Sequence, residues 1–122
     1  MKRVFMSVPM HDRKLDDINK DIRAAIQAFS KYKGLDIDGD EFEFINTMQT
    51  GPGVSVPYER VWYLGKAIEK LATCDLVIFC EGWHRADGCR VENYIADTYD
   101  IPRYQYKDGK IVPMWNERDY WD

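Results

Sequence analysis

Hydrophobic residues along the chain fall either into short continuous runs or into longer stretches with helical spacing. The runs at residues 4–8 and 76–80 predict buried strands, and those at 42–45 and 101–104 predict two more. Apolar positions three and four apart predict two amphipathic helices. These positions are Leu15, Ile18, Ile22, Ile26 and Phe29 in the first helix, and Val61, Leu64, Ile68, Leu71 and Ala72 in the second. A third helix is expected over residues 88–99.

Residues that interrupt regular structure lie between these elements. Pro9 ends the first strand, because proline has no amide hydrogen to donate to a sheet, and Gly34 is a suitable stop for the first helix. A turn at 107–110 precedes a short apolar run at 111–113, which suggests an edge strand. Residues 46–57 are rich in Gly, Pro and small polar residues, and they predict a long loop of a kind that is often functional in small domains.

The order of the expected elements indicates the fold class. Strands that alternate with helices are typical of a three-layer α/β/α domain, and we expect a central, mostly parallel sheet of four to five strands. Ligands of such sheets bind at the carboxyl ends of the strands. Two loops satisfy that condition, residues 7–12 after the first strand and residues 81–87 after the strand at 76–80.

Composition narrows the class of protein. The 122 residues suffice for one domain, which we assign to residues 1–122, and 45% hydrophobic and 31% charged residues are ordinary for a soluble globular protein. The net charge of −4 and scattered Lys and Arg argue against a nucleic-acid polymer as partner. No apolar stretch approaches the roughly 20 residues of a membrane span, and the first residues do not resemble a signal peptide. Three cysteines without a CxxC pair indicate free thiols, so we expect a cytoplasmic protein.

The segment from residue 80 to 94 carries several possible metal ligands. Cys80, His84, Cys89 and Glu92 have suitable donor atoms, but structural zinc sites usually pair cysteines two to four residues apart. We therefore interpret the two cysteines as packing residues, and we expect neither a metal nor a cofactor.

Glu92 in the same segment has two interpretations. If Asp87 is the N-cap of the third helix, the positive helix end should keep Glu92 ionised, as a nucleophile or base requires. Gly88 would let the backbone approach a ligand closely. Alternatively, Glu92 is only an acidic residue placed favourably near a helix start. Trp83 and His84 lie on the preceding loop and could stack on a planar ring, although Trp83 could equally be a loop anchor.

Three stretches together resemble the nucleoside 2-deoxyribosyltransferase-like family, and more narrowly its small bacterial and phage members of unknown function. They are "VFMSVPM", "YLGKAIEKLATCDLVIF" and "GWHRADGCRVENYIADTYDIP", and the resemblance covers residues 3–103. It implies a flavodoxin-like (Rossmann-like) sheet, scission of N-glycosidic bonds in nucleosides or nucleotides, and a homodimer or larger homo-oligomer. The residue that matches the family's nucleophile is Glu92, which would attack the anomeric carbon in a double displacement.

Several residues around the quoted stretches could bind the substrate. Aromatic stacking on the base would fall to Trp83 and Phe5. The substrate-binding residues that we expect are Phe5, Ser7, Met10, His11, Trp83, His84, Arg85, Gly88 and Arg90. Of these, Ser7, His11, Arg85 and Arg90 have an alternative interpretation as surface or capping residues.

The chain departs from the family at three supporting positions. Phe5 stands where catalytic members often have tyrosine, Ala67 where they have aspartate, and Ala86 with Asp87 where nucleotide-cleaving members place a serine for the phosphate.

The leading hypothesis for the function is a deoxyribosyltransferase or N-glycoside hydrolase. The alternative, favoured by these departures, is a non-catalytic protein that sequesters a nucleotide or nucleotide-derived signal. A third interpretation, a purely structural module, would not explain the long loop at 46–57 or the loop that contains Gly82 and Trp83.

The aromatic tail of Trp115, Tyr120 and Trp121 has two interpretations. It would suit a subunit interface, or it would cap the protein's own core.

Overall fold

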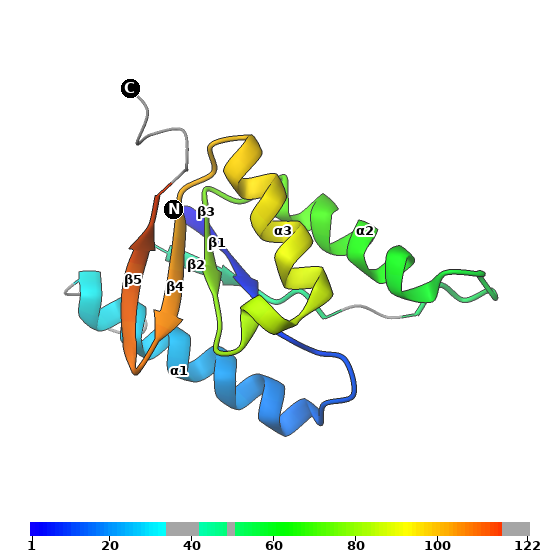
Figure 1. Ribbon diagram of the computed structural model, residues 1–122, viewed down its shortest axis with the longest axis horizontal. Coiled ribbons are helices and arrows are strands. Elements are labelled where there is room, and N and C mark those ends of the chain that lie inside the picture. Colours follow the sequence, from blue (N-terminus) through cyan, green and yellow to red (C-terminus); the bar gives the residue numbers. More distant parts are fainter. Residues whose placement is uncertain (34–41, 49–50, 116–122) are drawn as a thin grey trace.

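The computed structural model describes residues 1–33, 42–48 and 51–115 of the chain, and its strands and helices alternate as the hydrophobic pattern predicts (Figure 1). The elements in chain order are β1 (Lys2–Ser7), α1 (Leu15–Lys33), β2 (Phe42–Ile45), α2 (Glu59–Leu71), β3 (Leu76–Phe79), the 3₁₀ turn η1 (Trp83–Arg85), α3 (Asp87–Thr98), β4 (Arg103–Lys107) and β5 (Lys110–Met114). Among the described residues, no helix combines the length and the apolar character that crossing a membrane requires.

The strands form one sheet in the order β2-β1-β3-β4-β5. The pairs β1–β2, β1–β3 and β3–β4 are parallel, and β4–β5 is antiparallel. This is the strand order of flavodoxin-like folds with an antiparallel edge strand, and it confirms the predicted three-layer, mostly parallel architecture. From β1 the chain passes to β2 on one side of β1, and it then crosses back to place β3 on the other side of β1. The carboxyl ends of β1 and β3 therefore form the switch point at which such sheets bind ligands.

Helices cover both faces of the sheet, with α1 on one face and α2 and α3 on the other (Figure 1). Successive strand residues point to opposite faces, so each strand contributes to two cores. On the α1 side, Val4 and Met6 pack with Phe29 and other residues of that helix. On the opposite side, Phe5 packs with Ala67 of α2 and with residues of α3.

The predicted core positions differ from the observed ones mainly at helix ends. Leu15 and Val61 are 53% and 65% exposed, and Ala72 is exposed as well. Each of the three lies at or near an end of its helix, so helical spacing alone overstated their burial. The proposed stop at Gly34 lies outside the described residues.

The turn predicted at 107–110 is a tight hairpin between β4 and β5. Asp108 and Gly109 both have positive φ, 52° and 79°, as a two-residue type I′ turn requires. Pro113 lies in β5 opposite Tyr104 and is tolerated because β5 is an edge strand.

Candidate functional site

Three side chains lie in a row across the sheet at the carboxyl ends of its parallel strands. Ser7 of β1 is in register with Phe79 of β3, and Phe79 is in register with Gln105 of β4. Adjacent strands are about 4.8 Å apart, so Ser7 and Gln105 are about 10 Å apart on either side of Phe79. The contacts of all three residues lie on the α3 side of the sheet.

Glu92 projects from α3 onto the Ser7 end of this row. The Ser7 hydroxyl donates a hydrogen bond of 2.7 Å to Glu92 Oε1. The interaction is buried, with Ser7 1% and Glu92 6% exposed. The carboxyl group expected from the sequence to carry the chemistry thus lies at the β1–β3 switch point.

The protonation state of Glu92 differs from the expectation. Burial raises the pKa of the Glu92 carboxyl to about 7, and the hydrogen bond from Ser7 opposes this rise only in part. Glu92 is the sixth residue of α3, beyond the first turn in which the positive helix end acts strongly. The prediction that the helix end holds Glu92 ionised was therefore wrong, and near neutral pH the ionised and protonated forms are both populated.

Cys89 lies one turn before Glu92 in α3 and also contacts the side chain of Ser7. Burial raises the pKa of the Cys89 thiol to about 12, and a hydrogen bond with Ser7 lowers it in part. Burial also raises the pKa of Cys80, which is fully enclosed. Both cysteines are therefore neutral thiols in the core. In the described parts of the chain, no group of three or more His, Cys, Asp or Glu side chains could hold a metal ion.

Trp83 occupies the other end of the row. Gly82 adopts a positive φ of 78°, which turns the chain out of β3 into η1. The Trp83 ring packs on Phe79 with centroids 4.9 Å apart, and its Nε1 donates to Gln105 Oε1 at 3.3 Å. Trp83 and Gln105 are both half-buried, so each keeps surface for a ligand. His84 is exposed and meets Trp83 edge-on, with centroids 6.1 Å apart.

The two loops predicted to form the site do meet. A Cβ atom placed on Gly82 would lie 4.0 Å from Pro9 Cγ and 3.5 Å from Arg85 Nη2. Arg13 fixes the first loop by donating to the Pro9 carbonyl at 2.9 Å and by pairing with Asp21 at 2.7 Å.

Other residues of the first loop point away from Glu92 or are bound locally. Met10 is half-buried against the α1-side core. His11 is exposed, and its Nε2 lies 3.2 Å from Asp12 Oδ2. Neither makes a contact with Ser7 or Glu92 among the interactions of the described residues.

Phe5 and Gly88 have packing roles that the sequence did not indicate. Phe5 has no exposed surface and packs with Ala67 beneath the site, so its ring offers no face to a ligand. A Cβ on Gly88 would point toward Leu64 of α2, at 3.9 Å from its Cδ1, so this position faces α2.

The start of α3 is arranged differently from the prediction. Ala86 is the N-cap and provides no side-chain hydrogen bond, whereas Asp87 is the first helical residue. The assignment of Asp87 as N-cap was therefore wrong. Its carboxylate pairs instead with Arg90 in the next turn and with Arg60 of α2 at 3.5 Å. Arg85 and Arg90 are both exposed.

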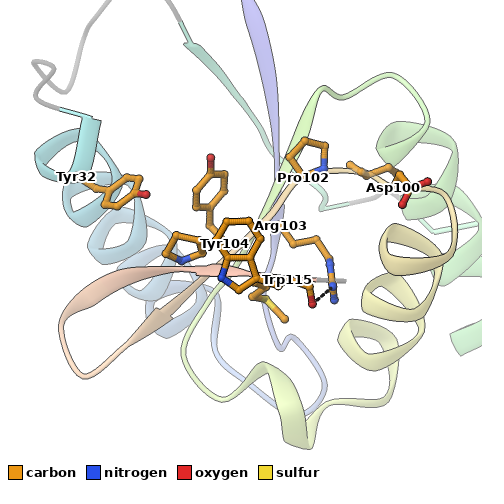
Figure 2. Close-up of a pocket in the computed structure, with 9 residues that line it drawn as sticks. Tyr32, Asp100, Pro102, Arg103, Tyr104 and Trp115 are labelled. Carbon is orange, nitrogen blue, oxygen red and sulfur yellow. Dashed lines mark hydrogen bonds between the residues drawn. The ribbon is translucent and has the colours of Figure 1, made fainter. Parts of the chain in front are cut away.

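A separate shallow hollow of about 280 Å³ lies at the other end of the strands, away from Glu92, where β4 begins and β5 ends (Figure 2). Its lining includes Tyr32, Tyr104 and Trp115, and Arg103 donates to the Trp115 carbonyl at 3.0 Å across one side. Arg103 also binds Asn93 and Asp97 of α3, so its charge ties β4 to that helix. This hollow contains no counterpart of the buried carboxyl, and we place the candidate site at Glu92.

Gln105 is the residue of the site that sequence reasoning missed. It lies in a strand whose start was predicted two residues too early, and its position beside Phe79 depends on strand register, which hydrophobic patterning does not reveal. The chain as a whole matches no model of a known protein family, no curated protein and no solved structure.

Proposed function

We propose that the chain cleaves or transfers the N-glycosidic bond of nucleosides or nucleotides, with Glu92 as the nucleophile. The observation that carries the proposal is the buried Glu92 carboxyl, held by Ser7 at the switch point of a flavodoxin-like sheet. The family resemblance supplies the reaction class.

The energetics of Glu92 support a chemical role. A carboxyl group whose pKa is raised to about 7 by burial destabilises the folded chain at neutral pH, and a neutral side chain would avoid that cost. Perturbed acids in crevices are concentrated at functional sites. A residue that served only as a good helix-start residue would remain exposed, as Asp87 does on the same helix.

The proposed reaction is a double displacement. An ionised Glu92 oxygen attacks C1′ of the sugar, the C1′–N bond breaks, and the base leaves with the bonding electrons and takes a proton from solvent. Water then attacks C1′ of the resulting glycosyl ester, the bond from C1′ to the Glu92 oxygen breaks, and the water proton passes to solvent, which restores the free carboxylate. In a transfer, a nitrogen of a second base attacks C1′ instead and loses its proton to solvent. Ser7 orients the attacking carboxylate, and the flat surface of Trp83 receives the base.

The decisive experiment follows base release by chromatography from a panel of nucleosides and nucleoside monophosphates. Glu92→Gln should abolish release, because an amide cannot form the ester. Glu69→Gln makes the same change at an exposed α2 residue that pairs with Lys66, and it should leave release unaffected. Release at the wild-type rate in Glu92→Gln would rule out the assigned nucleophile.

A second candidate is a non-catalytic protein that binds a nucleotide or nucleotide-derived signal at the same place. The apolar surroundings favour it, because Phe5 and Ala67, at positions where catalytic relatives carry polar groups, are packed together in the core. Calorimetry separates the two candidates. Tight binding without base release, and unaltered by Glu92→Gln, would favour the binding protein.

The same proposal includes the setting of the protein. We propose that it acts in the cytoplasm as a homodimer or higher homo-oligomer, as the resemblance implies. Exposed apolar side chains on α2 and α3, with Val61 65% and Tyr94 71% exposed, support an assembly through these helices. Sedimentation velocity that shows only a monomer at micromolar concentration would contradict it.

A further inference from the structure

We infer that Gln105 recognises the edge of the bound base and selects bases that present a carbonyl oxygen over bases that present an amino group. The inference rests on the proposed function, because it takes the ligand to be a nucleoside. It assigns specificity to a residue outside the two loops and outside the start of α3.

The position of Gln105 relative to Glu92 fits a nucleoside that lies across the row. Glu92 is held above Ser7 at one end, and Gln105 lies two strands away, about 10 Å across the sheet. A sugar whose C1′ faces Glu92 would direct its base along the row toward Trp83 and Gln105. Phe79 lies between the two ends and supports the Trp83 ring from below.

The hydrogen bond to Trp83 fixes what the Gln105 amide can offer. Trp83 Nε1 donates to Gln105 Oε1, so the oxygen of the amide is directed at the indole. A glutamine amide also has two N–H donors, and among the described residues none is hydrogen-bonded to them. Gln105 is half-buried and not enclosed, and we place these donors at the edge of the surface on which the base would stack.

Two free donors distinguish base edges by polarity. Uracil and hypoxanthine carry a carbonyl oxygen where cytosine and adenine carry an amino group. The Gln105 N–H groups would hydrogen-bond to the carbonyl oxygen of uracil or hypoxanthine. They would face the amino group of cytosine or adenine, which is also a donor, so no hydrogen bond would form there. A neutral hydrogen bond of this kind corresponds to a preference of about tenfold.

The test uses Gln105→Glu, which has the same shape. A carboxylate still accepts from Trp83 Nε1, so the anchor of the indole is retained, whereas both donors are replaced by acceptors. Binding of uridine against cytidine and of inosine against adenosine is measured by calorimetry, with the ribo- and 2′-deoxy forms. The wild type should prefer uridine and inosine about tenfold, and Gln105→Glu should reverse the preference.

A matched control is Gln27→Glu on the exposed side of α1, which adds the same charge away from the site. It should keep the wild-type preference. An unchanged preference in Gln105→Glu, with nucleosides still bound, would overturn the inference and leave the proposed function standing. The 5′-monophosphates of the same four nucleosides are measured alongside, and if the wild type binds neither the nucleosides nor their monophosphates, the proposed function and this inference both fail.

Discussion

Glu92 shows how the surroundings of one carboxyl group set its proton affinity. The group has lost most of its water and gained the Ser7 hydroxyl as a donor, with the neutral thiol of Cys89 beside it. Desolvation favours the protonated form, and a hydrogen bond to the carboxylate favours the ionised form. Burial prevails, so the pKa of Glu92 rises to about 7, and Ser7 limits that rise.

Removal of the Ser7 hydroxyl should therefore raise the Glu92 pKa further. Because the proposed nucleophile is the ionised form, kcat/KM for base release should increase with pH through the Glu92 pKa. In Ser7→Ala the midpoint of this profile should move to higher pH by about one unit, since a hydrogen bond to a charged group contributes about 1.5 kcal/mol. The measurement is kcat/KM between pH 5 and 9, together with a ¹³C NMR titration of the carboxyl group.

Ser7→Thr is the control, because it retains the hydroxyl. Its midpoint should stay with that of the wild type, even if the added methyl group lowers the melting temperature. A Ser7→Ala midpoint equal to that of the wild type in both measurements would show that the hydroxyl does not act on the Glu92 proton.

At the scale of elements, hydrophobic patterning predicted the strands and helices because each buries a continuous apolar face. Burial at helix ends was predicted less well, since helical spacing does not reveal which end residues remain exposed, as Val61 does near the start of α2. Part of the candidate site could be proposed from the sequence: Trp83 lies in the loop after a buried strand, and Glu92 is the position at which the resemblance places the nucleophile. Gln105 could not be predicted, because its partner depends on how β3 and β4 are paired.

Two glycines provide a test of the local backbone conformations. Gly109 has a φ of 79° in the β4–β5 turn, and Gly65 lies inside α2; at both positions an added Cβ would meet no atom within 4 Å. Gly109→Ala should destabilise the protein by about 1 kcal/mol, because a side chain disfavours left-handed backbone. Gly65→Ala should stabilise it by up to about 1 kcal/mol, because alanine is the better helix residue.

Urea denaturation of the two variants measures both effects against the wild type. Neither substitution introduces a clash, so changes of opposite sign in the free energy of unfolding would reflect backbone conformation and not packing. A Gly109→Ala variant as stable as the wild type would contradict the type I′ turn assigned to the hairpin.

At the scale of the whole molecule, the sheet order explains why a buried carboxyl is found at this place. The crossover from β2 to β3 on the far side of β1 leaves the carboxyl ends of β1 and β3 without a connecting helix directly above both. The loop after β3 brings α3 back over this gap, so Glu92 meets Ser7 although the two residues are 85 positions apart in the sequence. Alternation of elements predicted the parallel sheet, but the sequence contains no direct signal for this long-range contact.

The stability of the folded chain should depend on pH through the same contact. The Glu92 pKa is raised from 4.5 to about 7, so the folded state binds its proton more tightly than the unfolded state. The stability that this proton contributes is complete below pH 4.5 and is lost as the pH rises through about 7.

The Glu92→Gln variant tests this dependence, because its side chain cannot ionise and should not lose that stability as the pH rises. The free energy of unfolding of Glu92→Gln relative to the wild type should therefore increase by about 2–3 kcal/mol between pH 5 and pH 8, because one pKa unit corresponds to about 1.4 kcal/mol. Urea denaturation of both proteins at the two pH values measures this difference, and the comparison cancels the titration of groups that the two proteins share. A difference that stays constant with pH would mean that Glu92 is as well solvated in the folded chain as in the unfolded one, which would contradict both its burial and the argument that the chain retains this carboxyl for chemistry.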